Sequence, residues 1–187
     1  MTASEALQRL KDGNARFVAG AATRRDWLDL SEGQRPFATI LGCSDSRVPP
    51  EILFDAGLGE LFVVRVAGNV VGDEILGSLA YALEHLRTPL FAVLGHEKCG
   101  AVQAALQAKL HGAKEHKRIA DLVDLIVPAL DKEMSWERAV EANVRHAVRQ
   151  LAATPGGRAA AKAGRIEIVG AVYELATGRV RFLKGDD

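Results

Sequence analysis

FATILG, residues 37–42, and LFAVLG, residues 90–95, are two apolar runs that each end in glycine. Both are interpreted as buried strands, because short continuous apolar runs are typical of a parallel sheet covered on both faces. Chemically reactive residues follow each run directly: CSDSR at 43–47 and HEKC at 96–99. In parallel sheets, ligands bind beyond the carboxyl ends of strands, where the strand order changes direction. The two segments are therefore expected to lie at such a point.

The rest of the chain alternates between strand and helix patterns. An amphipathic helix is predicted at Ser4–Val18 with Ser4 as its N-cap, and the polar stretch Asp26–Pro36 is expected to connect it to the first core strand. The prolines at 49 and 50 should keep the loop 43–50 from forming a regular helix, and TPGG at 154–157 should break the chain. Strands are predicted at 37–41, 61–66, 90–94, 165–173 and 179–183, and helices at 73–86, 98–110, 115–130 and 135–151.

This order of elements predicts an α/β fold. We expect a mostly parallel central sheet, flanked by helices, with about four parallel strands and a C-terminal antiparallel edge strand that forms a hairpin around residues 176–178. An N-terminal helical arm, residues 1–36, should precede the α/β core, residues 37–187, within a single domain spanning 1–187. A chain of 187 residues can bury a sizeable core in one domain.

Composition excludes several classes of protein. Lys+Arg and Asp+Glu are both 24, so the chain lacks the basic excess expected of a nucleic-acid binder. No apolar run approaches the ~18 residues of a membrane span, and the first residues lack the pattern of a secretory signal. Cys43 and Cys99 are the only cysteines, too few for a disulfide framework. We therefore expect a cytoplasmic protein with no nucleic-acid or membrane partner.

The two strand-end segments together offer four donors for a metal ion. Cys43 and Cys99 supply thiols, His96 an imidazole and Asp45 a carboxylate, which form a complete tetrahedral set for zinc. The spacing of three between His96 and Cys99 brings both side chains to one side of a first helical turn. Each half of the pattern is weak alone, but their combination in a chain with two cysteines favours a zinc site.

Three other interpretations use the same residues. A redox pair would need the two thiols within disulfide distance, although the chain has no Cys-x-x-Cys. A nucleophilic Cys–His pair is open to either thiol, yet leaves the second thiol without a role. A structural site with four protein ligands leaves Arg47 without a role. Because Arg47 can hold the Asp45 carboxylate in a bidentate pair, the pattern favours a catalytic zinc site.

These motifs resemble those of the β-class carbonic anhydrases. The resemblance is carried by CSDSRVPPE at 43–51, FVVR at 62–65 and GHEKCG at 95–100, and it extends from roughly Ser4 to Phe182. It implies one Zn²⁺ per subunit, bound by Cys43, His96 and Cys99. Asp45 is then either the fourth ligand (a closed site) or paired with Arg47, which leaves that position to water (an open site). The implied activity is reversible hydration of CO2 to bicarbonate and a proton through zinc-bound hydroxide, with Asp45 and Arg47 as catalytic residues.

The resemblance also implies a substrate pocket and an oligomer. The pocket residues are Gln34, Phe62, Tyr81, Val48 and Gly100. The smallest unit is a homodimer, or a dimer of dimers, with the active site at the subunit interface and the N-terminal helix packed on the partner subunit. Ile40 stands where some bacterial members carry the Trp of a regulatory bicarbonate pocket, which favours an open, water-bound site without that pocket.

Two alternatives for function remain open at this point. Hydrolases of carbonyl sulfide or carbon disulfide resemble this family and share its ligands, so the motifs do not separate these substrates from CO2. A non-catalytic oligomer stabilised by zinc belongs to a different class of protein. It would not require Asp45, Arg47, Gln34 or Tyr81, all of which are present.

Overall fold

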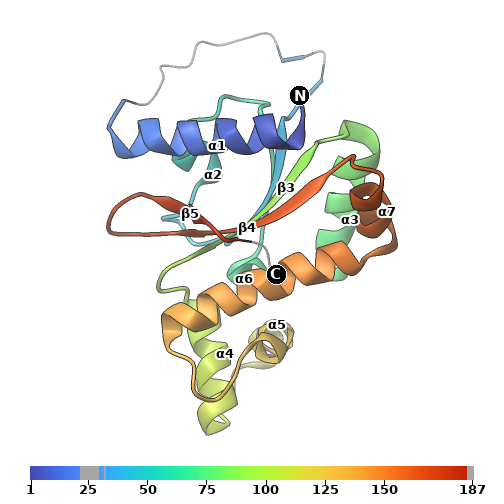
Figure 1. Ribbon diagram of the computed structural model, residues 1–187. Coiled ribbons are helices and arrows are strands. Elements are labelled where there is room, and N and C mark those ends of the chain that lie inside the picture. Colours follow the sequence, from blue (N-terminus) through green and yellow to red (C-terminus); the bar gives the residue numbers. More distant parts are fainter. Residues whose placement is uncertain (22–29, 32, 185–187) are drawn as a thin grey trace.

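The computed structural model describes residues 1–21, 30–31 and 33–184 as a five-stranded sheet with helices on both faces (Figure 1). The strand order is β2-β1-β3-β4-β5. Neighbouring strands from β2 to β4 run parallel, and β5 is antiparallel to β4. The strand bounds are β1 Ala38–Gly42, β2 Leu61–Arg65, β3 Leu90–His96, β4 Glu167–Tyr173 and β5 Val180–Phe182. The predicted α/β fold, with an antiparallel edge strand in a C-terminal hairpin, is confirmed.

The helices cover the two faces of the sheet in two layers (Figure 1). On one face, α1 (Ala3–Val18) and α2 (Pro50–Leu53) enclose a core with inward-facing residues of β1 and β3. On the other face, α6 (Trp136–Ala153) lies against β3 and β4. The same layer contains α3 (Asp73–Tyr81), α4 (Gly100–His111), α5 (Lys117–Ile126) and α7 (Pro155–Lys162). Both faces of β1 and β3 are therefore buried, which explains their continuous apolar sequences.

Two glycines allow α6 to approach the sheet closely. A Cβ atom on Gly95 of β3 would lie 2.4 Å from Cγ2 of Val144, and one on Gly170 of β4 would lie 2.9 Å from Cγ1 of the same valine. Contacts this short do not occur between real carbon atoms, so only glycine fits at these positions. Because Gly95 immediately precedes His96, the close approach fixes α6 beside the end of β3.

α1 is fixed to the sheet of its own chain. The Asn14 carboxamide, which is buried, donates from Nδ2 to the carbonyl oxygens of Leu53 (3.1 Å) and Gly178 (2.9 Å). Its Oδ1 accepts from the Val180 amide at 2.8 Å. One side chain thus ties α1 to α2 and to the C-terminal hairpin. Packing of α1 on a partner subunit stays a prediction.

Gly13 of α1 lies directly against the backbone of Phe54, and its replacement tests this close contact. In a Gly13→Ala variant the new Cβ would lie 1.8 Å from the Phe54 carbonyl oxygen, so α1 must move away. We expect a loss of about 1–3 kcal/mol in the free energy of unfolding, measured by urea denaturation. Gly77→Ala is the control: Gly77 is also inside a helix but has open space around it. Since alanine favours helix, the control should be unchanged or slightly more stable. Equal destabilisation of both variants would contradict the close contact.

Two segments predicted to interrupt regular structure instead begin helices. α2 starts at Pro50 with Pro49 as its N-cap, and α7 starts at Pro155. The break after α6 is confirmed, since this helix ends at Ala153, and residues 43–49 form a loop as predicted. The prediction missed the two new helices, because the first helical residue needs no amide N–H and proline is therefore tolerated there. Thr154 ends α6 and also caps α7, because its Oγ1 accepts a hydrogen bond from the Gly157 amide at 3.0 Å.

The ends of several other helices differ from the predicted ones by a few residues. The N-cap of α1 is Thr2, not Ser4: Thr2 and Glu5 form a reciprocal capping box. The predicted helix 73–86 is α3 followed by a π-helical turn, Ala82–Leu86, and the predicted helix 115–130 is α5 followed by a 3-10 turn, Val127–Ala129. α4 begins at residue 100, so the second thiol lies at its N-cap rather than inside the helix. Part of the predicted connector 26–36, residues 26–29 and 32, lies outside the described residues.

Candidate metal centre

Three donor residues meet where β1 and β3 end. Gly42 is in register with Leu94, so Cys43 leaves the sheet beside the last residues of β3. His96 is the final residue of β3, and Cys99 is the N-cap of α4. In the sheet, β2 lies on one side of β1 and β3 on the other, so the strand order reverses between β1 and β3. Ligands of parallel sheets bind at such a point, beyond the carboxyl ends of the strands. The predicted convergence of the two segments is confirmed.

The geometry of the three donors fits a tetrahedral metal ion. Their ligating atoms all lie within 4.8 Å of one another, and all three residues are buried. The sulfur atoms of Cys43 and Cys99 are 4.0 Å apart. Two sulfurs bound to one tetrahedral zinc at ~2.3 Å would be separated by about 3.8 Å. The observed spacing is therefore close to that of a zinc site and far from the ~2 Å of a disulfide.

His96 presents a free ring nitrogen to this site. Its Nδ1 lies 2.8 Å from the Glu97 carbonyl oxygen. A carbonyl only accepts hydrogen bonds, so Nδ1 must carry the proton and Nε2 the lone pair. Nε2 is buried without a hydrogen-bond partner among the described residues. A buried polar atom without a partner is costly, whereas a metal ion would satisfy it.

The two thiols share their protons unequally. The hydrogen bond from Cys99 lowers the pKa of Cys43 to about 4, and the amide of Gly68 adds a bond to the Cys43 sulfur at 3.3 Å. The same thiol–thiol contact, with burial, raises the pKa of Cys99. The contact therefore favours the thiolate at Cys43 and the thiol at Cys99. A bound cation favours two thiolates, so metal binding should release the remaining proton.

Asp45 and Arg47 form the predicted bidentate pair at the rim of the site. Arg47 donates from Nε to Oδ1 at 2.9 Å and from Nη2 to Oδ2 at 2.7 Å, and its backbone amide adds a bond to Oδ1 at 3.0 Å. These hydrogen bonds hold the pKa of Asp45 well below its usual range. Oδ2 is also 3.8 Å from Nε2 of His96. The carboxylate therefore lies next to the donors but is directed by Arg47.

Sequence reasoning missed several residues that support this centre. Arg65 at the end of β2 donates to the carbonyl oxygens of Cys43 (2.9 Å) and Asp45 (2.6 Å), which fixes the loop between the ligands. The sequence could have indicated this role, because Arg65 lies at the end of a predicted strand, on the same sheet edge as the donors. Trp136 and Asn143 of α6 bond the backbone of Cys99 and Gly68, and their sequence positions give no such signal.

The predicted pocket residues do not all join the donors within one chain. Val48 is buried and Gly100 begins α4, directly after a donor. Phe62 pairs with Thr39 near the start of β1, toward the opposite end of the strand from the donors. Its ring stacks on Tyr81, with centroids 6.2 Å apart, and Tyr81 is 48% exposed. Gln34 is exposed and precedes β1. Gln34 and Tyr81 are thus exposed and Phe62 is half-buried, and Phe62 lies on the amino-end side of the sheet, away from the donors.

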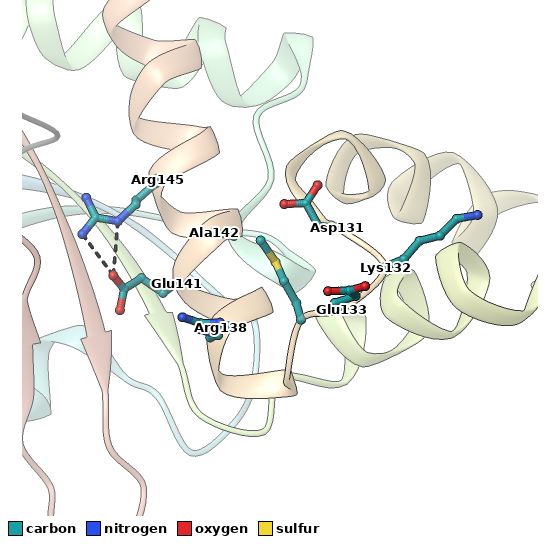
Figure 2. Close-up of a pocket in the computed structure, with 8 residues that line it drawn as sticks. Asp131, Lys132, Glu133, Arg138, Glu141, Ala142 and Arg145 are labelled. Atoms are coloured by element: carbon teal, nitrogen blue, oxygen red, sulfur yellow. Dashed lines mark hydrogen bonds and ion pairs between the residues drawn. The ribbon is translucent and has the colours of Figure 1, made fainter.

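A wide surface cavity lies elsewhere, along the outer side of α6 (Figure 2). Its volume is about 760 Å³, and its lining carries charges of both signs. Figure 2 shows that Arg145 pairs with Glu141, which also binds Arg181, so this carboxylate is already neutralised within the chain. None of the three donors Cys43, His96 and Cys99 lines the cavity, whose residues are Asp131, Lys132, Glu133, Met134, Arg138, Glu141, Ala142 and Arg145.

Known proteins resemble this chain in sequence and in fold. A family model described as carbonic anhydrase matches residues 38–180. The carbonic anhydrase of Mycolicibacterium smegmatis is 43% identical over 189 residues, covering 94% of this chain and 90% of that protein. Carbonic anhydrase 2 of Mycobacterium tuberculosis is 41% identical over 186 residues, covering 93% and 89%.

Solved structures of β-carbonic anhydrases have the same fold. The CafA enzyme of Aspergillus fumigatus superimposes with a TM-score of 0.77 at 26% identity, over 98% of this chain and 91% of that one. The Coccomyxa enzyme, solved with acetazolamide, gives a TM-score of 0.73 at 27% identity, over 96% and 82%. With the family match spanning most of the chain, these similarities show that the chain belongs to the β-carbonic anhydrase family.

Proposed function

We propose that the protein is a zinc-dependent lyase that catalyses the reversible hydration of CO2 to bicarbonate and a proton. The observation that carries the proposal is the buried cluster of two sulfur donors and one imidazole whose Nε2 has no partner among the described residues, next to a carboxylate held by an arginine. Membership in a family whose relatives are named carbonic anhydrase supports the same activity.

Each residue of the centre has a distinct part in this proposal. Cys43, His96 and Cys99 would hold Zn²⁺. The chemistry that zinc supplies in such a site is acidification of water, which furnishes a hydroxide nucleophile near neutral pH. Asp45 is ionised and can only accept hydrogen bonds, so it would orient the attacking water by accepting its proton in a hydrogen bond. Arg47 would keep that carboxylate away from the metal, as in an open site.

The substrate pocket in this proposal is completed by a second copy of the chain. Phe62, Tyr81 and Gln34 lie toward the surface at the amino-end side of β1 and β2, where a neighbouring subunit could meet them. A homodimer, or a dimer of dimers, would bring these side chains to the partner's site, beside its Val48 and Gly100 positions. The apolar rings would then exclude bulk water from CO2, and the amide of Gln34 would donate a hydrogen bond to a substrate oxygen.

No observation favours the other candidates over CO2. The sulfur analogues, carbonyl sulfide and carbon disulfide, find no support in the names of the relatives reported above. A purely structural zinc site would not need the Asp45–Arg47 pair. Among the described residues, no helix is both long and apolar enough to cross a membrane. We propose a cytoplasmic location, where the two thiols remain reduced.

The test is stopped-flow CO2 hydration by the purified protein, with bound zinc measured on the same sample. We expect about one zinc per chain and a rate that rises from pH 6 toward pH 9, because two thiolates offset the metal charge and leave the water less acidic than at a three-histidine site. Asp45 does not contribute to this rise: its lowered pKa keeps it ionised throughout the range.

Chelator-treated protein is the control, and it should be inactive until zinc is restored. A zinc-replete protein without hydration activity at alkaline pH would favour the structural oligomer instead. Faster turnover of carbonyl sulfide than of CO2 would move the assignment to the sulfur analogue.

A further inference from the structure

We propose that Asn143 and Trp136 of α6 are positioning residues: their hydrogen bonds fix the backbone that orients the two thiol ligands, and this sets the affinity of the site for its metal. The inference rests on the zinc site of the proposed function and concerns residues outside the set of ligands. Each side chain bonds the backbone next to one sulfur, so one helix controls both.

Asn143 acts on the first thiol through Gly68. Its Nδ2 donates to the Gly68 carbonyl oxygen at 2.8 Å, and the amide of Gly68 donates to the Cys43 sulfur at 3.3 Å. Asn143 is 2% exposed and is the one polar residue among the buried positions of α6. A buried carboxamide in an apolar face is costly unless it is bonded, so its bond to Gly68 fixes its orientation.

Gly68 transmits this constraint because its own conformation is restricted. Its φ is +70°, and a Cβ there would lie 2.8 Å from Cδ1 of Ile126 and 3.1 Å from Cβ of Ala101. The residue therefore has neither the space nor the backbone geometry for another side chain. With the carbonyl held by Asn143, the amide N–H stays directed at the sulfur of Cys43.

Trp136 acts on the second thiol. Its indole Nε1 donates to the Cys99 carbonyl oxygen at 3.2 Å. The same carbonyl accepts the first helical hydrogen bond of α4, from the Gln103 amide at 3.0 Å. Two donors on one carbonyl fix the backbone of Cys99 at the N-cap, and with it the direction of the side chain.

The spacing of the two residues makes α6 a single rigid support. Trp136 and Asn143 are seven residues apart, which is about two helical turns and places them on the same side of the helix. The contact of Val144 with Gly95 seats α6 directly beside His96. The same helix therefore contacts the backbone that positions both thiols and the strand that ends in His96.

The physical consequence concerns the metal–sulfur bonds. An amide N–H directed at a thiolate withdraws electron density from the sulfur and fixes its lone pairs relative to the metal. Loss of such an outer partner typically weakens metal binding by roughly 10–100-fold. We therefore expect these two residues, although they do not touch the metal, to change its affinity and its spectrum.

The experiment compares Asn143→Ala with the matched control Val140→Ala. Val140 lies on the same buried face of α6, and its truncation removes a similar volume without a hydrogen bond. Zinc dissociation constants are measured by chelator competition, and the thiolate-to-metal charge-transfer band is recorded on the cobalt-substituted proteins. We expect roughly 10–100-fold weaker zinc binding and a shifted band for Asn143→Ala only. Equal affinity and the same band in both variants would overturn the inference.

Trp136→Phe gives a second test: it keeps an aromatic ring at this position and removes the indole N–H together with the second ring of the indole. We expect weaker zinc binding by up to roughly 10-fold. The effect should be smaller than for Asn143→Ala, because Asn143 fixes Gly68, whose amide bonds a ligand sulfur, whereas Trp136 fixes only the backbone of Cys99. Wild-type affinity in Trp136→Phe would remove Trp136 from the proposal. The outcomes also distinguish the proposed function from the positioning role. Wild-type protein that binds no zinc overturns the proposed function. Wild-type protein that binds zinc, with equal zinc affinities in Asn143→Ala and Val140→Ala, overturns only the positioning role.

Discussion

Replacing His96 by alanine should abolish zinc binding and CO2 hydration together. His96 is fully buried, and its Nε2 has no hydrogen-bond partner among the described residues. We therefore expect this nitrogen to bind the metal ion. Outer partners of metal ligands already cost roughly 10–100-fold in affinity when removed. Loss of one of three direct ligands should exceed that range and leave the purified protein with little zinc. Metal analysis and stopped-flow hydration on the same sample measure both effects.

His111→Ala is the matched control. His111 is the last residue of α4 and is exposed, so its removal deletes an imidazole without touching the donors. This variant should keep zinc and activity. Because His96→Ala also leaves a cavity, its thermal stability should be compared with that of metal-free wild type, which separates the loss of packing from the loss of the metal. A His96→Ala protein that retains one zinc per chain would disprove the ligand role.

The sheet and the donor cluster were predictable because they depend on local patterns. Continuous apolar runs identify β1 and β3, and parallel pairing then brings the residues after them to one edge. The short helices at Pro50 and Pro155 were not predicted, since proline interrupts a helix in its interior but is accommodated at its first position. Sequence alone does not show which of these two positions a proline will occupy.

The support of the site was beyond sequence reasoning for a different reason. Asn143 is 75 residues from Gly68, and Trp136 is 37 residues from Cys99, so these bonds exist only once α6 has packed on the sheet. That packing depends on glycines at positions 95 and 170, which in the sequence are indistinguishable from ordinary strand glycines. The placement of Phe62 and Tyr81 away from the donors is likewise set by register, not by motif.

Replacing Arg47 by alanine should keep the zinc and remove most of the hydration activity. Arg47 makes three hydrogen bonds to the Asp45 carboxylate, two of them from its side chain. Without the side chain, Asp45 is free to rotate, and its Oδ2 is already 3.8 Å from Nε2 of His96. The carboxylate could then take the fourth position on the metal, as in a closed site. We expect a loss of roughly 10–100-fold in kcat/KM at unchanged zinc content.

Two observations separate this explanation from a loss of charge at Asp45. Removal of Arg47 should return the pKa of Asp45 toward its ordinary value of about 4, which still leaves it ionised above pH 6. The pH profile of Arg47→Ala should therefore keep its shape from pH 6 to 9 while the rate falls. Arg47→Lys retains a positive charge but loses the bidentate geometry, so its rate should lie between those of wild type and Arg47→Ala. Wild-type rates in zinc-replete Arg47→Ala would contradict this role. They would show that Asp45 stays off the metal without Arg47, so that the Asp45–Arg47 ion pair is only structural.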